Sequence, residues 1–213
     1  QGEDRILLNM GGIANFTFLS GDLDPDKVFA TDTGTGNTLL DAYMQRHFGL
    51  PYDADAEKAR MGTPHASLLT ALKDHVFFSG PVPKTTGPEL FNLSYLEAAQ
   101  RRSDTLTLSH EDVLATLCKF TADTIVDCLL FCGIQPAKVF MSGGGMHNPL
   151  VVAYLQEGFP HTEFLSTDTI GINGDAKEAV LFATLANEAL AGGNIRFGSR
   201  VPSVSMGKIS FPS

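Results

Sequence analysis

The sequence predicts an α/β protein built on a mixed β-sheet that carries helices on its faces. Its first part holds three strand patterns joined by short turns, as in an antiparallel meander. Its later part alternates apolar helical patterns with short strands, as in sheets whose strands are connected through helices. The 213 residues are 43% hydrophobic and 18% charged, which is enough apolar material for one sizeable core.

The three N-terminal strands follow one another closely. Residues 5–10 (RILLNM) form an apolar run that ends at a glycine pair. Residues 14–19 (ANFTFL) alternate apolar and polar side chains, which is typical of a strand. A polar turn at residues 20–26 leads to a third strand at residues 28–31.

A first helix and an irregular region come next. Residues 32–37 (DTGTGN) read as a loop that opens a helix at residues 38–48, which has an apolar stripe. Five prolines then break the chain into short pieces between about residues 51 and 100. We expect a helical and irregular insertion there, because its leucines and phenylalanines need burial.

The last part of the chain alternates helices and strands. A long helix at residues 110–132 begins after a Ser109 cap and is followed by a strand at residues 138–141. A helix at residues 149–157, a strand at residues 163–165 and a helix at residues 176–190 complete the order. The last helix is apolar on nearly every face, so we expect it to be central in the fold.

The charge of the chain excludes some classes of partner. The net charge is −9 and the sequence contains no run of lysines and arginines, which argues against nucleic acid. No window approaches the roughly 18 apolar residues of a membrane span. The three cysteines have no disulfide framework and suit a reducing cytoplasm. An acidic protein that handles phosphates must supply positive potential locally, from backbone amides, helix N-termini or a cation.

The first candidate site is a glycine pair between two strands, in residues 9–15 (NMGGIAN). Gly11 and Gly12 let the backbone approach an anion and offer its amides to phosphate oxygens. A plain tight hairpin is the alternative interpretation.

The second candidate lies in residues 32–37, between a strand and a helix. Gly34 and Gly36 allow a flexible turn, and the N-terminus of the helix favours phosphate. Asp32 could hold Mg²⁺ through water, or could accept hydrogen bonds from the turn itself.

The third candidate is residues 142–148 (SGGGMHN), again placed between a strand and a helix. Three adjacent glycines cost chain entropy, so the close approach of a flat ligand is a good reason for them. Asn148 is suited to cap the next helix, and His147 is better suited to capping or packing than to catalysis.

The fourth candidate is Glu178, near the start of the last helix. Asp175 and Glu178 have the spacing of a helix cap and its reciprocal partner. A contact from Glu178 to a substrate is the alternative, favoured by its position at the mouth of an apolar helix.

Taken together and in this order, these segments resemble the second half of anhydro-N-acetylmuramic acid kinases. Six segments in register make the resemblance specific. They are LNMGGIAN at residues 8–15, DTGTGN at 32–37, PKTTGPELFN at 83–92, DVLATLCKFTADTI at 112–125, SGGGMHN at 142–148 and GDAKEAVLFATLA at 174–186. The family is commonly DTGPGN where this chain has DTGTGN, so Thr35 replaces a proline.

The resemblance implies a fold and a set of site residues. Residues 1–213 would be the C-terminal, ribonuclease-H-like lobe of a two-lobed sugar kinase of the actin and heat-shock ATPase superfamily, with its insertion at about 51–100. Two groups of residues would face ATP, and Glu178 would reach the sugar. The phosphate side would comprise Gly11, Gly12, Asn15, Asp32, Gly34, Gly36 and Asn37, and the adenosine side Gly143, Gly144, Gly145 and Asn148.

The resemblance also implies a reaction. Water opens the internal ether bridge of anhydro-N-acetylmuramic acid while ATP, with Mg²⁺, phosphorylates the sugar to N-acetylmuramic acid 6-phosphate in cell-wall recycling. The family's first phosphate loop and its aspartate base are absent from the 213 residues, and we expect them upstream of Gln1, in an N-terminal lobe. A homodimer is an open possibility for the assembly. A non-catalytic nucleotide-binding module and a kinase for another sugar remain the alternatives.

Overall fold

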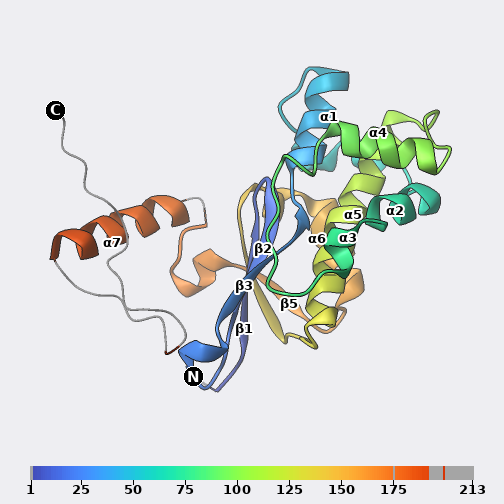
Figure 1. Ribbon diagram of the computed structural model, residues 1–213. Coiled ribbons are helices and arrows are strands. Elements are labelled where there is room, and N and C mark those ends of the chain that lie inside the picture. Colours follow the sequence, from blue (N-terminus) through green and yellow to red (C-terminus); the bar gives the residue numbers. More distant parts are fainter. Residues whose placement is uncertain (1, 175, 192–198, 200–213) are drawn as a thin grey trace.

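A five-stranded mixed sheet forms the centre of the molecule (Figure 1). The computed structural model describes residues 2–174, 176–191 and 199, with Glu178 described by its backbone alone. The strand order is β3-β2-β1-β4-β5; β2 pairs antiparallel with β1 and β3, and β4 pairs parallel with β1 and β5. The strands are β1 (Arg5–Met10), β2 (Ile13–Leu19), β3 (Phe29–Thr35), β4 (Lys138–Ser142) and β5 (Glu163–Ser166). This order confirms the predicted meander extended by helix-connected strands.

Most of the helices gather on one side of this sheet, whereas α7 lies on the other (Figure 1). The α-helices are α1 (Thr38–Phe48), α2 (Ala66–Lys73), α3 (Val76–Ser79), α4 (Leu93–Arg102), α5 (His110–Phe131), α6 (Pro149–Gly158) and α7 (Lys177–Ala191). Single 3₁₀ turns are η1 (Pro25–Lys27), η2 (Ala54–Ala56), η3 (Ala59–Met61), η4 (Gly144–His147) and η5 (Thr167–Ile170). In the described part of the chain, no helix combines the length and the apolar character needed to cross a bilayer.

The core lies between the sheet and α5. Alternate side chains of β1, Ile6, Leu8 and Met10, are fully buried on the face that α5 covers, because successive strand residues point to opposite faces. The two ends of α5 are set by local chemistry, as the sequence predicts. The amide of Asp112 donates to Ser109 Oγ over 3.1 Å, and Gly133 follows the helix with a left-handed φ of 70°.

β3 is longer than predicted, because Asp32 to Thr35 continue the strand instead of forming a loop. A bulge between Ala14 and Asn15 of β2 keeps the two strands paired beyond Asp32. The buried Thr33 hydroxyl also donates to the Ala14 carbonyl over 3.1 Å. The predicted six-residue loop is therefore reduced to Gly36 and Asn37 before α1 begins.

The insertion at about residues 51–100 packs on α5 through aromatic rings. It contains η2, η3, α2, α3 and most of α4. The rings of Phe78 and Phe91 lie 5.6 and 6.3 Å from the ring of Phe120 on α5. This packing gives the apolar side chains of a proline-broken segment the burial that the sequence requires.

The prediction that the last helix is central is wrong. α7 stands apart from the sheet in Figure 1, and its Val180, Leu181 and Phe182 are 60%, 52% and 68% exposed. An apolar pattern shows that a helix needs cover, but not which surface provides it. No described element covers these three side chains.

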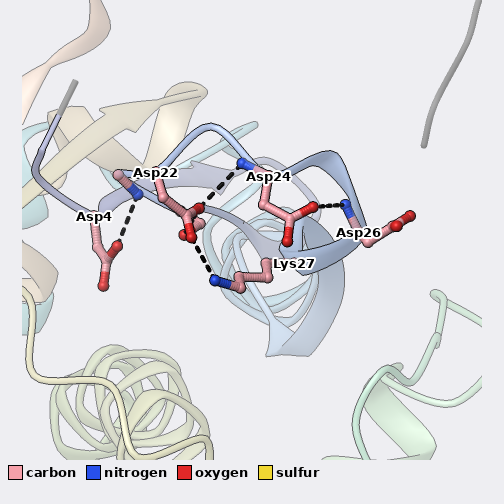
Figure 2. Close-up of polar contacts among 7 residues, drawn as sticks. Asp4, Asp22, Asp24, Asp26 and Lys27 are labelled. Atoms are coloured by element: carbon pink, nitrogen blue, oxygen red, sulfur yellow. Dashed lines mark hydrogen bonds and ion pairs between the residues drawn. The ribbon is translucent and has the colours of Figure 1, made fainter. Parts of the chain in front are cut away.

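An acidic cluster surrounds the turn between β2 and β3; Asp4, just before β1, and the aspartates of the turn bind the backbone of this turn (Figure 2). The amides of Gly21, Asp24 and Asp26 donate to the carboxylates of Asp4, Asp22 and Asp24 respectively. The Lys27 ammonium pairs with Asp22 and holds the pKa of that carboxyl well below its usual range. Such bonds are typical of Asx turns, so we assign this cluster a structural part.

Candidate functional site

The glycine pair after β1 is joined directly to the start of α1. The amides of Gly36 and Asn37 donate to the carbonyls of Gly12 and Gly11, each over 2.8 Å. The Thr38 hydroxyl donates to the Gly12 carbonyl over 2.7 Å. Two of the predicted phosphate-binding segments therefore form one joint at the ends of β1 and β3.

The glycine turn after β4 packs against the same joint. Gly143 has a left-handed φ of 83°, and a Cβ there would lie 2.8 Å from the Met10 carbonyl oxygen. A Cβ on Gly145 would lie 2.7 Å from Met10 Cβ. The Asn37 side-chain amide reaches the Met10 carbonyl over 3.4 Å. Because Gly143 and Gly145 have no side chain, this turn can lie against the end of β1.

Not all of the predicted glycines face a ligand. Gly34 and Gly36 are both buried. A Cβ on Gly34 would meet Phe78 and Thr124 at 3.2 Å, on the α5 side, so Gly34 lies away from the joint. A Cβ on Gly36 would lie 2.2 Å from the Gly11 carbonyl oxygen. Gly34 and Gly36 are therefore closely packed in this geometry, and their predicted place on the phosphate side stays a prediction.

The amides of Gly11, Gly12 and Gly144 remain available. Gly12 and Gly144 are exposed. In the described chain, none of the three amides donates a hydrogen bond outside the regular strands. The nearest atom to a Cβ on Gly144 would be Asn37 Nδ2, at 3.4 Å, so that glycine opens to solvent. Backbone donors from two turns that pack on each other therefore have no partner within the described part of the chain, as in a site for an anion.

A cavity of about 450 Å³ opens beside these amides. It brings together Asn37, which the family resemblance assigns to the phosphate side, and Gly144 and Asn148, which the resemblance assigns to the adenosine side. The Asn148 carboxamide oxygen caps α6, accepting from the amides of Leu150 and Val151 over 3.1 Å each, as predicted for a cap. The volume is in the usual range for a small-molecule pocket.

A row of polar side chains crosses four strands next to the joint. The ladders place Asp32 opposite Asn15, Asn15 opposite Asn9, and Asn9 opposite Ser142. Asn9 lies on the face of β1 opposite to the core, because its neighbours in the strand point inward. Lys177 Nζ donates to Asn9 Oδ1 over 3.0 Å and to Ser142 Oγ over 2.8 Å. The row therefore has the Lys177 ammonium near its Ser142 end and the Asp32 carboxylate at its other end.

Asp32 is engaged by the segment Lys84 to Thr86 of the insertion. Its Oδ2 accepts from Thr85 Oγ1 over 3.0 Å and from the Thr86 amide over 2.8 Å. The Asp32 amide donates to the Lys84 carbonyl over 2.9 Å. The sequence left open that Asp32 accepts hydrogen bonds from its own turn instead of holding Mg²⁺. Asp32 does accept hydrogen bonds, but their donors, Thr85 and Thr86, belong to the insertion. Among the described residues, no group of three or more His, Cys, Asp or Glu could hold a metal.

Glu178 lies in the first turn of α7, and its side chain is outside the described part of the structure. Asp175 is outside it as well. The predicted contact between Glu178 and a sugar therefore stays a prediction. Its neighbour Lys177 is the residue of this motif that the structure places at the site.

Sequence reasoning missed Lys177 and Asp41. Lys177 stands beside Glu178 in the same motif, but only the fold shows that it reaches β1 and β4. Asp41 lies four residues after Asn37 on α1, hence on the same helix face, and that spacing could have revealed it. Asp41 lines the cavity, and burial raises the pKa of its carboxyl to about 6.

The order of the strands, with helices on the faces of the sheet, defines an α/β lobe built on a mixed five-stranded sheet. Two solved structures share this fold. The activator of the 2-hydroxyisocaproyl-CoA dehydratase from Clostridium difficile, with bound ADPNP, has a TM-score of 0.50 at 16% identity and matches 76% of this chain and 53% of its own. Component A of the (R)-2-hydroxyglutaryl-CoA dehydratase from Acidaminococcus fermentans has a TM-score of 0.51 at 15% identity and matches 76% and 54%.

The family is shown by sequence. The model of the anhydro-N-acetylmuramic acid kinase family matches residues 1–206, and the chain belongs to that family. The anhydro-N-acetylmuramic acid kinase of Pseudoalteromonas atlantica is 52% identical over 217 residues, which are 99% of this chain and 54% of the relative. The one of Pseudoalteromonas translucida is 50% identical, over 98% and 54%. The chain spans about half the length of the curated relatives it matches.

Proposed function

We propose that the chain is the nucleotide-binding lobe of an ATP-dependent kinase that converts anhydro-N-acetylmuramic acid and water to N-acetylmuramic acid 6-phosphate. The observation that carries the proposal is the group of amides at Gly11, Gly12 and Gly144, which lie beside the cavity and bind no described residue outside the strands. Phosphoryl transfer depends mainly on positioning and on stabilising charge, and both are supplied by fixed backbone donors. Family membership supports the substrate.

The charges around the site favour one orientation of the bound nucleotide. The cavity is lined by the carboxyl groups of Asp41, Asp53 and Asp55, so it would repel phosphates. Gly11, Gly12 and Lys177 are not among the residues that line the cavity, and the Lys177 ammonium binds Asn9 and Ser142 at the ends of β1 and β4. The phosphate chain would therefore lie against Gly11 and Gly12, and the nucleoside would enter the cavity.

Mg²⁺ is part of the proposal, with Asp32 as its contact through water. One Asp32 oxygen binds Thr85 and Thr86, whereas Oδ1 makes no hydrogen bond with a described residue. One carboxylate oxygen suits Mg²⁺, which keeps several waters and takes its other ligands from substrate phosphates. When bound, the ion offsets the negative charge of the phosphates. We assign the base that activates water to a second lobe.

A second lobe is the partner that we propose. The chain spans 54% of its relatives, and the exposed apolar side chains of α7 need cover. An N-terminal lobe that packs on α7 would also close the nucleotide cleft and bring the sugar to the polar row. We place this two-lobed enzyme in the cytoplasm, where both ATP and the recycled sugar would be met.

The test uses the chain alone and a chimera in which the chain replaces the matching segment of the Pseudoalteromonas atlantica relative. With ATP and Mg²⁺, the chimera should convert the anhydro sugar and water to N-acetylmuramic acid 6-phosphate and release ADP, measured by mass spectrometry. The chain alone should bind ADP without turnover. A folded chimera that phosphorylates a different sugar would refute the substrate, and one that binds no nucleotide would refute the proposal as a whole.

A further inference from the structure

The cavity contains a carboxylate that has no partner among the described residues. Asp41 is half-buried on α1 and lines the cavity with Asn37 and Gly144. Its carboxylate makes no hydrogen bond or ion pair with any described residue. Burial raises the pKa of Asp41 to about 6, which reflects a charge that has lost water and gained no compensating donor. A bound molecule could supply that donor.

The other acidic residues of the cavity differ from Asp41. Asp53 Oδ1 and Oδ2 accept from the amides of Lys58 and Ala59, each over 2.9 Å, so this carboxylate is satisfied by the chain itself. Asp55 is exposed to solvent. Asp41 alone of the three combines burial with an unpartnered carboxylate. It is therefore the acid on which a ligand's hydroxyl groups would have the largest effect.

We propose that Asp41 binds the ribose hydroxyls of the nucleotide and so sets a preference for ribonucleotides over deoxyribonucleotides. The proposal rests on the function proposed above and assigns a residue to its sugar-recognition step. A carboxylate accepts hydrogen bonds only, and the vicinal 2′- and 3′-hydroxyls offer it two donors together. The pairing of an acidic side chain with ribose hydroxyls is physically well founded, since dinucleotide-binding folds use it too.

The position of Asp41 along α1 favours ribose over the other parts of the nucleotide. Asn37 stands at the phosphate end, because its amide donates to Gly11 and its side chain reaches Met10. Asp41 lies four residues further, about 6 Å along the helix axis. That step matches the distance from a phosphate group to the sugar that carries it. Tyr52 also lines the cavity and offers an exposed ring on which the base could stack.

The experiment measures the binding of ADP, 2′-deoxy-ADP and 3′-deoxy-ADP to the chimera by titration calorimetry. The unmodified chimera should bind ADP about tenfold more tightly than either deoxy analogue, as expected for a hydroxyl bound to a charged acceptor. Asp41→Asn should reduce that ratio to about twofold or less, chiefly by weakening ADP. Glu157→Gln on α6 removes a negative charge outside the cavity, and it should keep the tenfold ratio.

The outcomes separate the two proposals. If the unmodified chimera binds ADP but does not distinguish the deoxy analogues, the role of Asp41 is refuted and the nucleotide site stands. The same conclusion follows if Asp41→Asn keeps the full ratio. If the chimera binds none of the three nucleotides while its circular dichroism and melting are native-like, the proposed function itself fails. A folding defect in Asp41→Asn is checked by melting each variant before titration.

Discussion

Glycines in similar motifs have different structural roles in this molecule. Gly36 is buried and its α-carbon faces the Gly11 carbonyl at a distance that leaves no room for a methyl group. Gly144 is exposed and its α-carbon faces solvent near Asn37. The first is needed for the backbone of one turn to contact another, whereas the second keeps an amide accessible. The residue type is the same, and the surroundings decide its purpose.

Alanine at these two positions should separate packing from binding. Gly36→Ala places Cβ against backbone, so we expect the free energy of unfolding to fall by roughly 2 kcal/mol. Gly144→Ala should change that free energy by less than about 0.5 kcal/mol, while it weakens ADP binding by crowding the amide. Urea unfolding and calorimetric titration measure the two effects. Equal destabilisation by both variants would contradict the distinction.

The raised pKa of Asp41 predicts that the stability of the folded chain depends on pH. Its pKa is raised from 3.8 to about 6 in the folded chain, so the folded state holds this proton more tightly than the unfolded state. The contribution of Asp41 to stability is therefore fully present below pH 3.8 and is lost as the pH rises through 6. Solvent screens a half-exposed carboxylate, so we expect the loss to be about 1 kcal/mol instead of the larger value that the shift itself implies.

Asp41→Asn should remove that loss. At pH 7.5 the variant should melt about 3 °C higher than the unmodified chain, and at pH 4 the two should melt together. Calorimetric melting at the two pH values measures the difference. A variant that is less stable at pH 7.5, or whose advantage is the same at pH 4, would show that burial of the charge is not what raises the pKa.

Most helices and their caps could be predicted from the sequence, whereas the way in which the elements pack together could be predicted only in part. The range predicted for α1, the caps Ser109 and Asn148, and the stop at Gly133 were predictable because each depends on neighbours in the chain. The length of β3 was not, because it depends on a bulge in β2 that no local pattern announces. At the site, the glycine segments were predictable from their composition. The bonds of Lys177 to β1 and β4 were not, since they join residues far apart in the sequence.

The cap of α6 gives a test at the level of a helix. Asn148→Ala removes the acceptor for the Leu150 and Val151 amides, so we expect the free energy of unfolding to fall by about 1 kcal/mol. Asn148→Asp keeps an acceptor there and should retain most of the stability. Urea unfolding of the three proteins measures this. If aspartate proves as harmful as alanine, the cap is not what Asn148 contributes.

At the scale of the whole molecule, α7 is the helix whose apolar side chains the described residues leave uncovered. Its apolar side chains are exposed on a helix that starts at the polar row, where Lys177 holds β1 and β4. A lobe packed on α7 would therefore be coupled to the site through Lys177. This arrangement explains why a helix that reads as central in the sequence has no cover here.

Phe182 on α7 distinguishes a covered helix from a free one. It is 68% exposed, so Phe182→Ser should leave the stability of the chain alone within about 0.5 kcal/mol. In the chimera, where the second lobe would bury this ring, the same change should cost about 3 kcal/mol or more. Thermal melting of both pairs measures the difference. An equally small effect in the chimera would mean that the second lobe does not pack on this face.

The most direct test of the central claim is a crystal structure of the chimera with a non-hydrolysable ATP analogue. We predict that the phosphate chain lies against the amides of Gly11 and Gly12, and that the ribose lies beside Asp41 in the cavity. A nucleotide bound elsewhere, or one whose phosphates lie farther than hydrogen-bond distance from both amides, would contradict the account.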